Sequence, residues 1–436
     1  MDLIIEKLIY GGDGLARLPA DEQGRGKAVF LPFVLEGEEV DAALYQQKRG
    51  FARGRANKVL QASPHRIEPV CPYFQRCGGC HYQHASYEHQ LAIKAAILKE
   101  NLLRIAKLDL AVELKIHSSA PWNYRNRTRL KVRSAPEFAL GYYRFGSHEL
   151  LPVKECPISS SLINRAIAAC WQIGRTEKNF LSDLEEVELF ANAEDTELLI
   201  EAYCFPNTSP ESAKLLVDAL QEILREIIGV VALKIHAPDL SGVKSSQPEE
   251  IAFSGLRELS YKTKHCSYRV TAGAFFQVNR CLTDELIDIV TSGHSGSTAL
   301  DLYAGVGLFS SVLNREFERV IAVESSPTSY ADLLYNSPPN VKAVCSTTEK
   351  YLKNVAGKLQ PDLVVVDPPR SGLGESTTHD LIALAAPQIT YVSCDPATLA
   401  RDLSGLLKAG YRVREAHMVD LFPQTFHLES VFHLIR

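Results

Sequence analysis

Two groups of cysteines in this 436-residue chain could do chemistry, and their settings differ. In "CPYFQRCGGC", Cys71, Cys77 and Cys80 crowd around a Gly-Gly turn, which suits thiolate ligands of a metal centre. In "YVSCDPATLARD", Cys394 stands alone between an apolar segment and an Asp-Pro pair that would open a helix. A helix N-terminus lowers the pKa of a thiol and favours the thiolate. We therefore predict that Cys394 is a nucleophile.

A glycine-rich turn, "DLYAGVGLFS", follows an apolar segment and predicts a cofactor loop. Gly305 and Gly307 let backbone N–H groups approach a ligand closely, and Ser310 stands where a dinucleotide loop carries its third glycine. Glu324 ends the next apolar segment, where an acid can accept hydrogen bonds from ribose hydroxyls. Together with Asp301, four residues before the first glycine, this pattern favours S-adenosylmethionine (SAM) over NAD.

A nucleophilic thiol beside a methyl donor indicates methylation at a carbon that is itself a poor nucleophile. Carbon 5 of a pyrimidine is one, because a thiolate added to carbon 6 creates an enolate whose carbon 5 can attack a methyl group. The carbon 5 proton must then leave to a base. Asp420 and Glu429 in "DLFPQTFHLESV" are candidates, and Glu429 is preferred because it precedes the final strand.

The elements that would position these residues fall into a predicted series of domains. After about residue 269, apolar strands alternate with amphipathic helices, which predicts an α/β fold with a doubly wound, Rossmann-like sheet. Ligands in such sheets bind at the carboxyl ends of the strands, where Asp367 of "VVVDPPRSG" also lies. The first sixty residues read as short strands with glycine turns, typical of a small OB-like β-barrel. The predicted units are a barrel at 1–60, a cysteine segment with a helix at 61–114, an α+β domain at 115–262 and the doubly wound domain at 263–436.

Charge is distributed unevenly along the chain, although the net charge is only −5. The tract from Lys48 to Arg66 contains no acid, and a second basic row occupies every second position of a predicted strand. Alternate residues of a strand share a face, so this row is either a solvated face or, with two such tracts in an acidic protein, a polyanion-binding surface. The row consists of Arg125, Arg127, Arg129, Lys131 and Arg133.

No signal peptide and no apolar run of membrane-spanning length are recognised, so a cytoplasmic protein without membrane contact is expected. Thiols stay reduced in the cytoplasm. The ten cysteines therefore indicate metal binding, catalysis or core packing rather than disulfides.

Seven motifs, in order along nearly the whole chain, resemble the RNA uracil-carbon-5 methyltransferases, which make 5-methyluridine. The resemblance extends to an N-terminal TRAM barrel and is strongest to the 23S rRNA enzymes of the RlmD type. It implies that the partner is an RNA, with 23S rRNA as the first candidate and tRNA as the alternative. It also implies that the protein is a monomer. The motifs are "GGDGLAR", "CPYFQRCGGC", "AGAFFQVN", "DLYAGVGLFS", "VDPPRSG", "VSCDPATLARDL" and "FPQTFHLESV".

The resemblance assigns roles to individual residues. Cys394 would attack carbon 6 and Glu429 would take the carbon 5 proton, while Phe275 would lie near the target base. Gln277, Tyr303, Glu324 and Asp367 match SAM contacts, whereas Leu308 replaces a polar SAM contact of some members. The set Cys71, Cys77, Cys80 and Cys156 matches the ligands of a 4Fe–4S cluster, although the spacing alone equally allows zinc.

Two other activities compete with this interpretation. Amino-group methylation needs no thiol, and an aromatic residue would then follow the two prolines, where Arg370 stands. An iron–sulfur RNA-binding protein without methyltransferase activity is the other alternative, and calorimetry of SAM binding distinguishes it. The segment 160–260 carries few motifs, so substrate choice could lie there.

Overall fold

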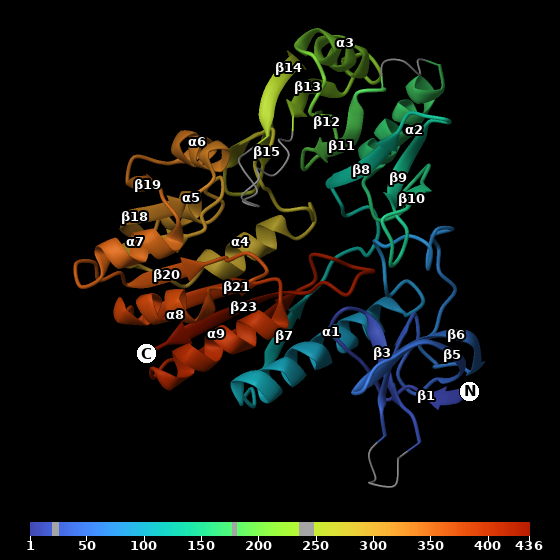
Figure 1. Cartoon of the computed structure of the whole chain (residues 1–436). Helices are drawn as coiled ribbons and strands as arrows, with labels where there is room; N and C mark the ends of the chain where they lie inside the picture. Colours follow the sequence, from blue (N-terminus) through green and yellow to red (C-terminus); the bar gives the residue numbers. More distant parts are fainter. Residues whose placement is uncertain (20–25, 177–180, 235–247) are drawn as a thin grey trace.

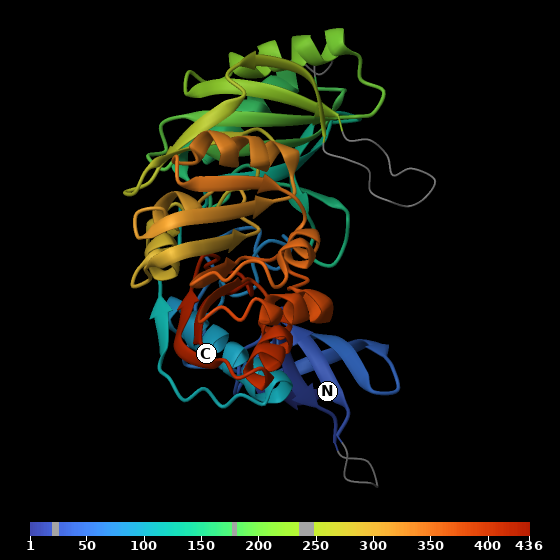
Figure 2. The same cartoon turned by 90° about the vertical axis from the view of Figure 1, so that its left-hand side faces the viewer.

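The structure, a computed structural model, describes residues 1–19, 26–176, 181–234 and 248–436. Figure 2 shows the central domain, the C-terminal sheet and the N-terminal barrel following one another from top to bottom. The α/β fold class predicted from the alternation of strands and helices is confirmed. No helix within the described ranges is long and apolar enough to cross a membrane.

The N-terminal barrel is a six-stranded sheet in the order β1-β5-β6-β4-β3-β2, packed around Val29, Leu31 and Val40. Four of its strands are short, as the glycine punctuation predicts, whereas β5 and β6 have 9 and 11 residues. Among the described residues the strands pair antiparallel except β4 with β6, which are parallel. The bounds are β1 (Asp2–Ile4), β2 (Lys7–Leu8), β3 (Asp13–Arg17), β4 (Ala28–Pro32), β5 (Glu39–Gln47) and β6 (Phe51–Gln61).

The cysteine segment follows the barrel as an irregular loop and leads into helix α1 (Tyr87–Asn101) and a π-turn, η1 (Leu102–Ala106). Ala95, Leu98 and Leu102 are buried, whereas Ile105, in the π-turn, is 41% exposed. The next strand, β7 (Leu114–His117), pairs with β22 in the C-terminal sheet. The prediction of a central domain beginning at residue 115 is therefore corrected, because β7 completes the sheet of the other domain.

The central domain is a seven-stranded sheet in the order β10-β9-β8-β11-β12-β13-β14, with α2 and α3 packed on one face. Helix α3 begins where Ser209 accepts a hydrogen bond from Ser212 N–H and Pro210 supplies the first turn. The bounds are β8 (Arg127–Arg133), β9 (Ala139–Tyr143), β10 (Leu150–Pro152), α2 (Ser161–Thr176), β11 (Leu184–Ala191), β12 (Leu198–Cys204), α3 (Pro210–Gln221), β13 (Ile227–Lys234) and β14 (Glu249–Gly255).

The C-terminal sheet has eight strands in the order β19-β18-β17-β20-β21-β23-β22-β7, and β23 alone runs antiparallel to both of its neighbours. Helices α4, α5 and α6 pack on one face, and α1, α7, α8 and α9 on the other (Figure 1). This is the doubly wound arrangement predicted from the sequence. A separate hairpin, β15 (Glu258–Lys262) with β16 (Ser267–Thr271), packs against α6.

The elements of the C-terminal domain begin and end close to the predicted apolar segments. Its strands are β17 (Gly296–Leu302), β18 (Phe317–Glu324), β19 (Val341–Cys345), β20 (Leu363–Val366), β21 (Gln388–Ser393), β22 (Arg412–Val419) and β23 (Glu429–Ile435). Its helices are α4 (Thr283–Thr291), α5 (Ser310–Leu313), α6 (Pro327–Asn336), α7 (Thr348–Val355), α8 (Gly374–Ala383) and α9 (Pro396–Lys408).

Candidate active site

A small cavity lies at the carboxyl ends of β17 and β20, where the sequence predicts the cofactor loop. Four of the predicted cofactor residues line it, namely Gln277, Tyr303, Gly305 and Asp367. Its enclosed volume is about 40 Å³, well below the roughly 300 Å³ at which ligand pockets usually begin. A bound SAM would therefore have to move part of the lining, which also includes Phe275, Phe276, Ala304, Val306, Leu308 and Phe309.

Two glycines with positive φ and hydrogen bonds to two acids, Asp301 and Glu324, fix the cofactor loop. Gly305 and Gly307 have φ of +57° and +94°, and a Cβ on Gly307 would lie 3.0 Å from Leu333 Cδ1. Buried Asp301 accepts hydrogen bonds from Ser310 N–H (3.1 Å) and the Ser310 hydroxyl (2.6 Å), and burial raises its pKa to about 7. These bonds fix the loop between β17 and α5.

Glu324 adjoins the cavity without being one of its lining residues. Its Oε2 accepts a hydrogen bond from Gly305 N–H at 2.9 Å, and its Oε1 accepts from Ser325 and Ser326 N–H. The predicted acid at the end of β18 thus lies beside the glycine loop, but here it bonds to the backbone.

The predicted nucleophile directly follows β21, and the predicted base begins the neighbouring antiparallel strand β23. Ser393 of β21 pairs with Ser430 of β23, so Cys394 and Glu429 flank that pair on the same side. Glu429 is 6% exposed, and its Oε1 is buried without a hydrogen-bond partner. Burial, and then the charge of Asp367, raise the pKa of Glu429 well above its usual value. An unpartnered buried carboxyl beside a thiol is typical of a catalytic site.

The prediction that Cys394 is a thiolate is corrected, because the surroundings of the thiol raise its pKa. Burial first, and then the charges of Glu429 and Asp367, raise the Cys394 pKa to about 12, although Arg370 lowers it. The start of α9 does not compensate, because Asp395 accepts hydrogen bonds from Ala397 and Thr398 N–H at 3.0 and 2.9 Å. The Asp395 carboxylate thus accepts the hydrogen bonds of the backbone N–H groups that were expected to stabilise the Cys394 thiolate.

Two further residues bear on the candidate site. Asp420, the alternative base, accepts hydrogen bonds from Lys94 (2.6 Å) and Tyr87 (2.9 Å) in a fully buried ion pair, which makes it a structural anchor. Arg370, which follows the two prolines after β20, lowers the pKa of both Cys394 and Glu429. Its position directly after the prolines at a strand end was a usable signal.

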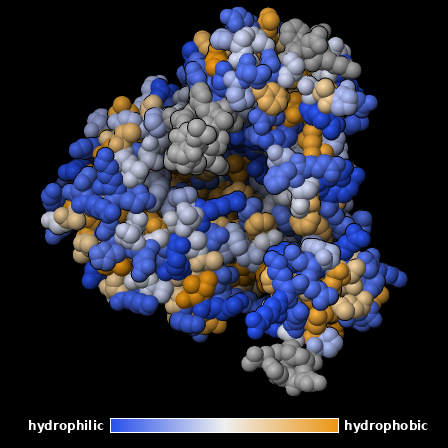
Figure 3. Space-filling model, viewed as in Figure 1, coloured by the Kyte–Doolittle hydropathy of each residue, from blue (hydrophilic) through white to orange (hydrophobic). Residues whose placement is uncertain are grey.

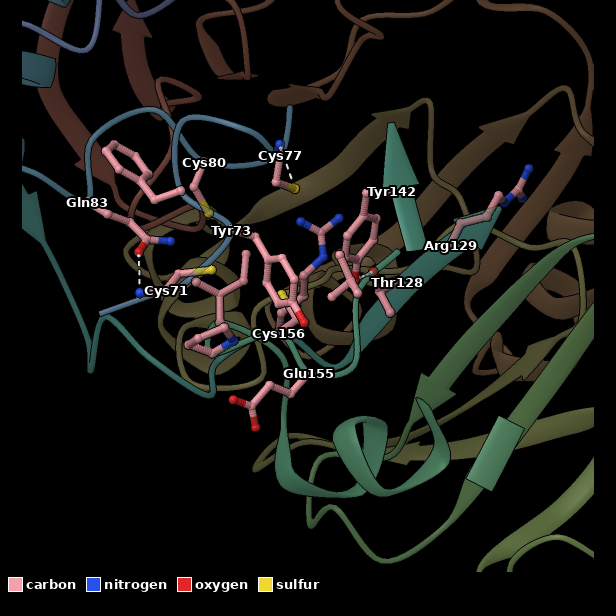
Figure 4. Close-up of a pocket in the computed structure, with 16 residues that line it drawn as sticks. Cys71, Tyr73, Cys77, Cys80, Gln83, Thr128, Arg129, Tyr142, Glu155 and Cys156 are labelled. Carbon is pink, nitrogen blue, oxygen red and sulfur yellow. Dashed lines mark hydrogen bonds between the residues drawn. The ribbon is translucent and has the colours of Figure 1, made fainter. Parts of the chain in front are cut away.

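The four predicted metal ligands line one cavity of about 230 Å³, and its lining is mostly apolar. Figure 4 shows Cys71, Cys77 and Cys80 on the loop after the barrel and Cys156 on the chain that follows β10. Burial raises the pKa of the Cys71, Cys77 and Cys80 thiols, and the charge of Cys156 adds to the increase. Across the described ranges, no three His, Cys, Asp or Glu side chains converge tightly enough to hold a single metal ion.

The row of cations on β8, predicted as a solvated face or a polyanion-binding surface, is paired in large part with acids of the protein itself. β11 places Glu188 opposite Arg129 and Glu186 opposite Lys131, and both opposing pairs are ion pairs. Arg127 is 9% exposed and is bonded to Glu188 and Glu201. Arg125 is half-buried and donates to the Arg127 carbonyl, while Arg133 is exposed at the strand end.

A second hollow of about 320 Å³ adjoins the candidate site, and Arg125, Arg127 and Arg129 from the row of cations form part of its wall. Phe275, 65% exposed, lines both this hollow and the cofactor cavity. Arg129 stacks on Tyr203 in the wall, with its Cζ 4.0 Å from the ring centre. Figure 3 shows the corresponding face of the molecule hollowed near its middle, with apolar surface visible inside.

Comparison with known proteins places this chain among proteins described as RNA methyltransferases. An RNA methyltransferase of Aquifex aeolicus, itself uncharacterized, is 34% identical, and the alignment covers 99% of this chain and 97% of that one. A similarly named protein of Thermotoga maritima is 31% identical over 99% of this chain and 98% of its own. The TRAM domain family matches residues 1–56, which confirms the N-terminal barrel.

The family described as tRNA (uracil-5-)-methyltransferase matches residues 86–436, and the chain belongs to that family. A solved structure of Pyrococcus abyssi tRNA (uracil-54, C5)-methyltransferase with S-adenosyl-L-homocysteine aligns over the full length of both chains. Its TM-score is 0.74 at 23% identity, which shows the shared fold.

Proposed function

We propose that this protein methylates carbon 5 of a uridine in structured RNA, with SAM as the methyl donor. The observation that carries the proposal is the placement of Cys394, directly after β21, and Glu429, at the start of the paired strand β23, near Asp367, which lines the cofactor cavity. A target carbon shielded in a base stack must be turned outward to reach these residues. Exposed Phe275, on the border of cavity and hollow, offers a ring on which such a base can stack.

The reaction proceeds by addition and elimination. Cys394, once deprotonated, adds through its sulfur to carbon 6, and the electron pair of the carbon 5–carbon 6 bond moves into an enolate. Carbon 5 then takes the methyl group from SAM, which leaves as S-adenosylhomocysteine. Glu429, as the carboxylate, removes the proton of carbon 5, and the returning electron pair expels the Cys394 thiolate.

The electrostatics of the protein's own residues set a condition on this mechanism. Burial and neighbouring acids raise the pKa of the Cys394 thiol and of the Glu429 carboxyl, and burial raises the pKa of Asp367 to about 7. The positive sulfonium of SAM favours the ionised forms of all three groups. Binding of the methyl donor would thereby activate the nucleophile and the base together.

Two variants test the mechanism on RNA from cells that lack the gene. Cys394→Ala should abolish formation of 5-methyluridine, measured by nucleoside mass spectrometry. Glu429→Gln should instead accumulate a covalent protein–RNA adduct that survives denaturing electrophoresis. Methylation at carbon 5 by the Cys394 variant would overturn the mechanism.

We propose 23S rRNA as the substrate, with the uridine of the tRNA T-loop as the alternative. The proposal rests on the motif resemblance, while the Pyrococcus abyssi neighbour acts on tRNA uracil-54. Mapping 5-methyluridine in rRNA and tRNA from cells with and without the gene decides between them. Loss from 23S rRNA supports the proposal, and loss from tRNA alone overturns it.

We also propose that Cys71, Cys77, Cys80 and Cys156 hold a 4Fe–4S cluster. What supports this is the single apolar cavity that all four thiols line, since a cluster fills a volume and its thiolate ligands surround it. When bound, the cluster would crosslink the loop after the barrel to the chain following β10, which restricts the unfolded chain.

Iron and acid-labile sulfide in anaerobically purified protein test the cluster. Cys156→Ala should lose both, together with the visible absorption of the cluster, while Cys345→Ala is the matched control because Cys345 is exposed on β19. Full iron content in the Cys156 variant would exclude this ligand set. Zinc in place of iron in the parent protein would establish the four-thiolate zinc alternative.

A further inference from the structure

A side chain of the N-terminal barrel reaches the predicted nucleophile, 384 residues away in sequence. The Tyr10 hydroxyl donates a hydrogen bond to the backbone carbonyl of Cys394 at 3.0 Å. Cys394 lies between the end of β21 and the N-cap residue of α9, so its carbonyl is outside both elements. A loop carbonyl has no ladder or helical partner, and its orientation depends on such a contact.

The turn that presents Tyr10 is itself packed against the candidate site. The Tyr10 ring meets Phe426 edge-on, with ring centres 5.4 Å apart, and Phe426 lies in the loop that leads to Glu429. Gly11 and Gly12 follow with φ of +107° and +93°. A Cβ on Gly12 would lie 3.0 Å from His81, so the turn needs glycine to approach the cysteine segment this closely.

Tyr10 lies close enough to the reactive groups for their charges to change the pKa of its phenol. Burial first, then the negative charges of Asp395, Cys394 and Glu429, raise the pKa of the Tyr10 phenol above its usual value. The hydroxyl therefore stays protonated at every pH at which the enzyme would work. It remains a hydrogen-bond donor to Cys394 even when the thiol ionises.

We propose that Tyr10 is a positioning residue for Cys394, and this inference rests on the proposed function. The hydrogen bond fixes the backbone of the nucleophile, so that the sulfur is aligned with carbon 6 of the bound base. The barrel thereby completes the active site, beyond any role in holding RNA. Such a role requires the barrel to be docked on the catalytic domain during each turnover.

Tyr10→Phe tests the hydroxyl alone, because the ring can keep its contact with Phe426. The rate of 5-methyluridine formation at saturating SAM and RNA should fall about fivefold to tenfold, the effect of one lost hydrogen bond. The dissociation constant for SAM, measured by calorimetry, should stay unchanged. Tyr45→Phe on β5 is the matched control, because Tyr45 is exposed on the same barrel, and it should keep the parent rate.

A second measurement needs neither RNA nor SAM. The alkylation of Cys394 by iodoacetamide, followed by peptide mass spectrometry in the intact protein, should be faster in Tyr10→Phe, because the released loop admits a small reagent. Cys170 and Cys204, both buried in the central domain, should stay as protected as in the parent protein. Their exposure in the variant would show general unfolding and count against the proposal.

The outcomes separate the two proposals. If the parent protein makes 5-methyluridine and Tyr10→Phe matches it in turnover and alkylation, the positioning role is wrong. If the parent protein makes no 5-methyluridine, the proposed function fails, and the alkylation of Cys394 still decides whether Tyr10 holds the loop.

Discussion

At the scale of single residues, the positive charge of Arg370 lowers the pKa of Cys394, whereas the neighbouring acids raise it. Removing its charge should raise the pKa of Cys394, because burial and the charges of Glu429 and Asp367 would then act without a nearby cation. We expect Arg370→Gln to slow alkylation of Cys394 by about tenfold at about pH 9, which corresponds to a shift of about one pKa unit.

Arg319→Gln is the control for this experiment, because Arg319 is an exposed arginine on β18 of the same sheet. An unchanged alkylation rate in Arg370→Gln would show that the cation does not act on the thiol. A rate lowered in both variants would indicate a change in net charge rather than a local effect.

The types and strand-end positions of Cys394, Glu429 and Asp367 could be predicted from sequence, because a doubly wound sheet collects such residues at one edge. The raised pKa values of Cys394 and Glu429 could be predicted only in part. The capping of α9 by Asp395 is local and is signalled by the Asp-Pro pair, whereas the depth at which Glu429 is buried is a tertiary fact. Tyr10 carries no sequence signal for its role, since only the packing of the barrel brings it to Cys394.

At the scale of elements, strand pairing decides what a pattern means. The alternating cations of β8 were predictable as one face of a strand, but the acids opposite them lie on β11, more than fifty residues later. Without the register, the row could be taken for a polyanion-binding surface. In the same way, β7 joins the sheet of the C-terminal domain through a parallel pairing with β22, which could not be predicted from its short sequence.

The pairing of β7 with β22 also assembles histidines, which predicts an acid-sensitive sheet edge. His117 lies 2.9 Å from His417 between ring nitrogens, and the His417 ring meets His433 of β23 edge-on. Burial first, and then neighbouring cations, lower the pKa of His417 to about 4 and of His433 to about 3. Both rings are thus neutral in the folded protein at pH values where an unfolded histidine is protonated.

Because the folded pKa values lie below the unfolded value, stability is retained above about pH 6.5 and is lost as the pH falls towards the folded values. At about pH 5, unfolding should take up about two protons through these two residues. His433→Asn should reduce the uptake by about one, measured from the slope of urea-unfolding free energy against pH. An unchanged slope would show that His433 is not neutral in the fold. His379→Asn, at an exposed position on α8, is the control.

At the scale of the whole molecule, the loop from Asp420 to Leu428 joins the N-terminal third to the catalytic strands. Its Gln424 carbonyl accepts hydrogen bonds from His81 and Tyr82 N–H, which directly follow the cysteine segment. Tyr124, ahead of β8, donates to the Pro423 carbonyl at 3.0 Å. The barrel, the cysteine segment and the central domain therefore converge on the loop that precedes Glu429.

The buried ion pair of Lys94 on α1 with Asp420 anchors this loop, since both side chains are at most 1% exposed. Lys94→Met leaves a buried carboxylate with one partner fewer, and we expect it to lower the free energy of unfolding by about 3 kcal/mol. Lys94→Met with Asp420→Asn removes both charges and should lie within about 1 kcal/mol of the parent, because the asparagine oxygen still accepts from Tyr87. Urea unfolding of the three proteins measures both differences. A double variant no more stable than the single one would show that shape, rather than charge pairing, holds the N-terminal third against the catalytic loop.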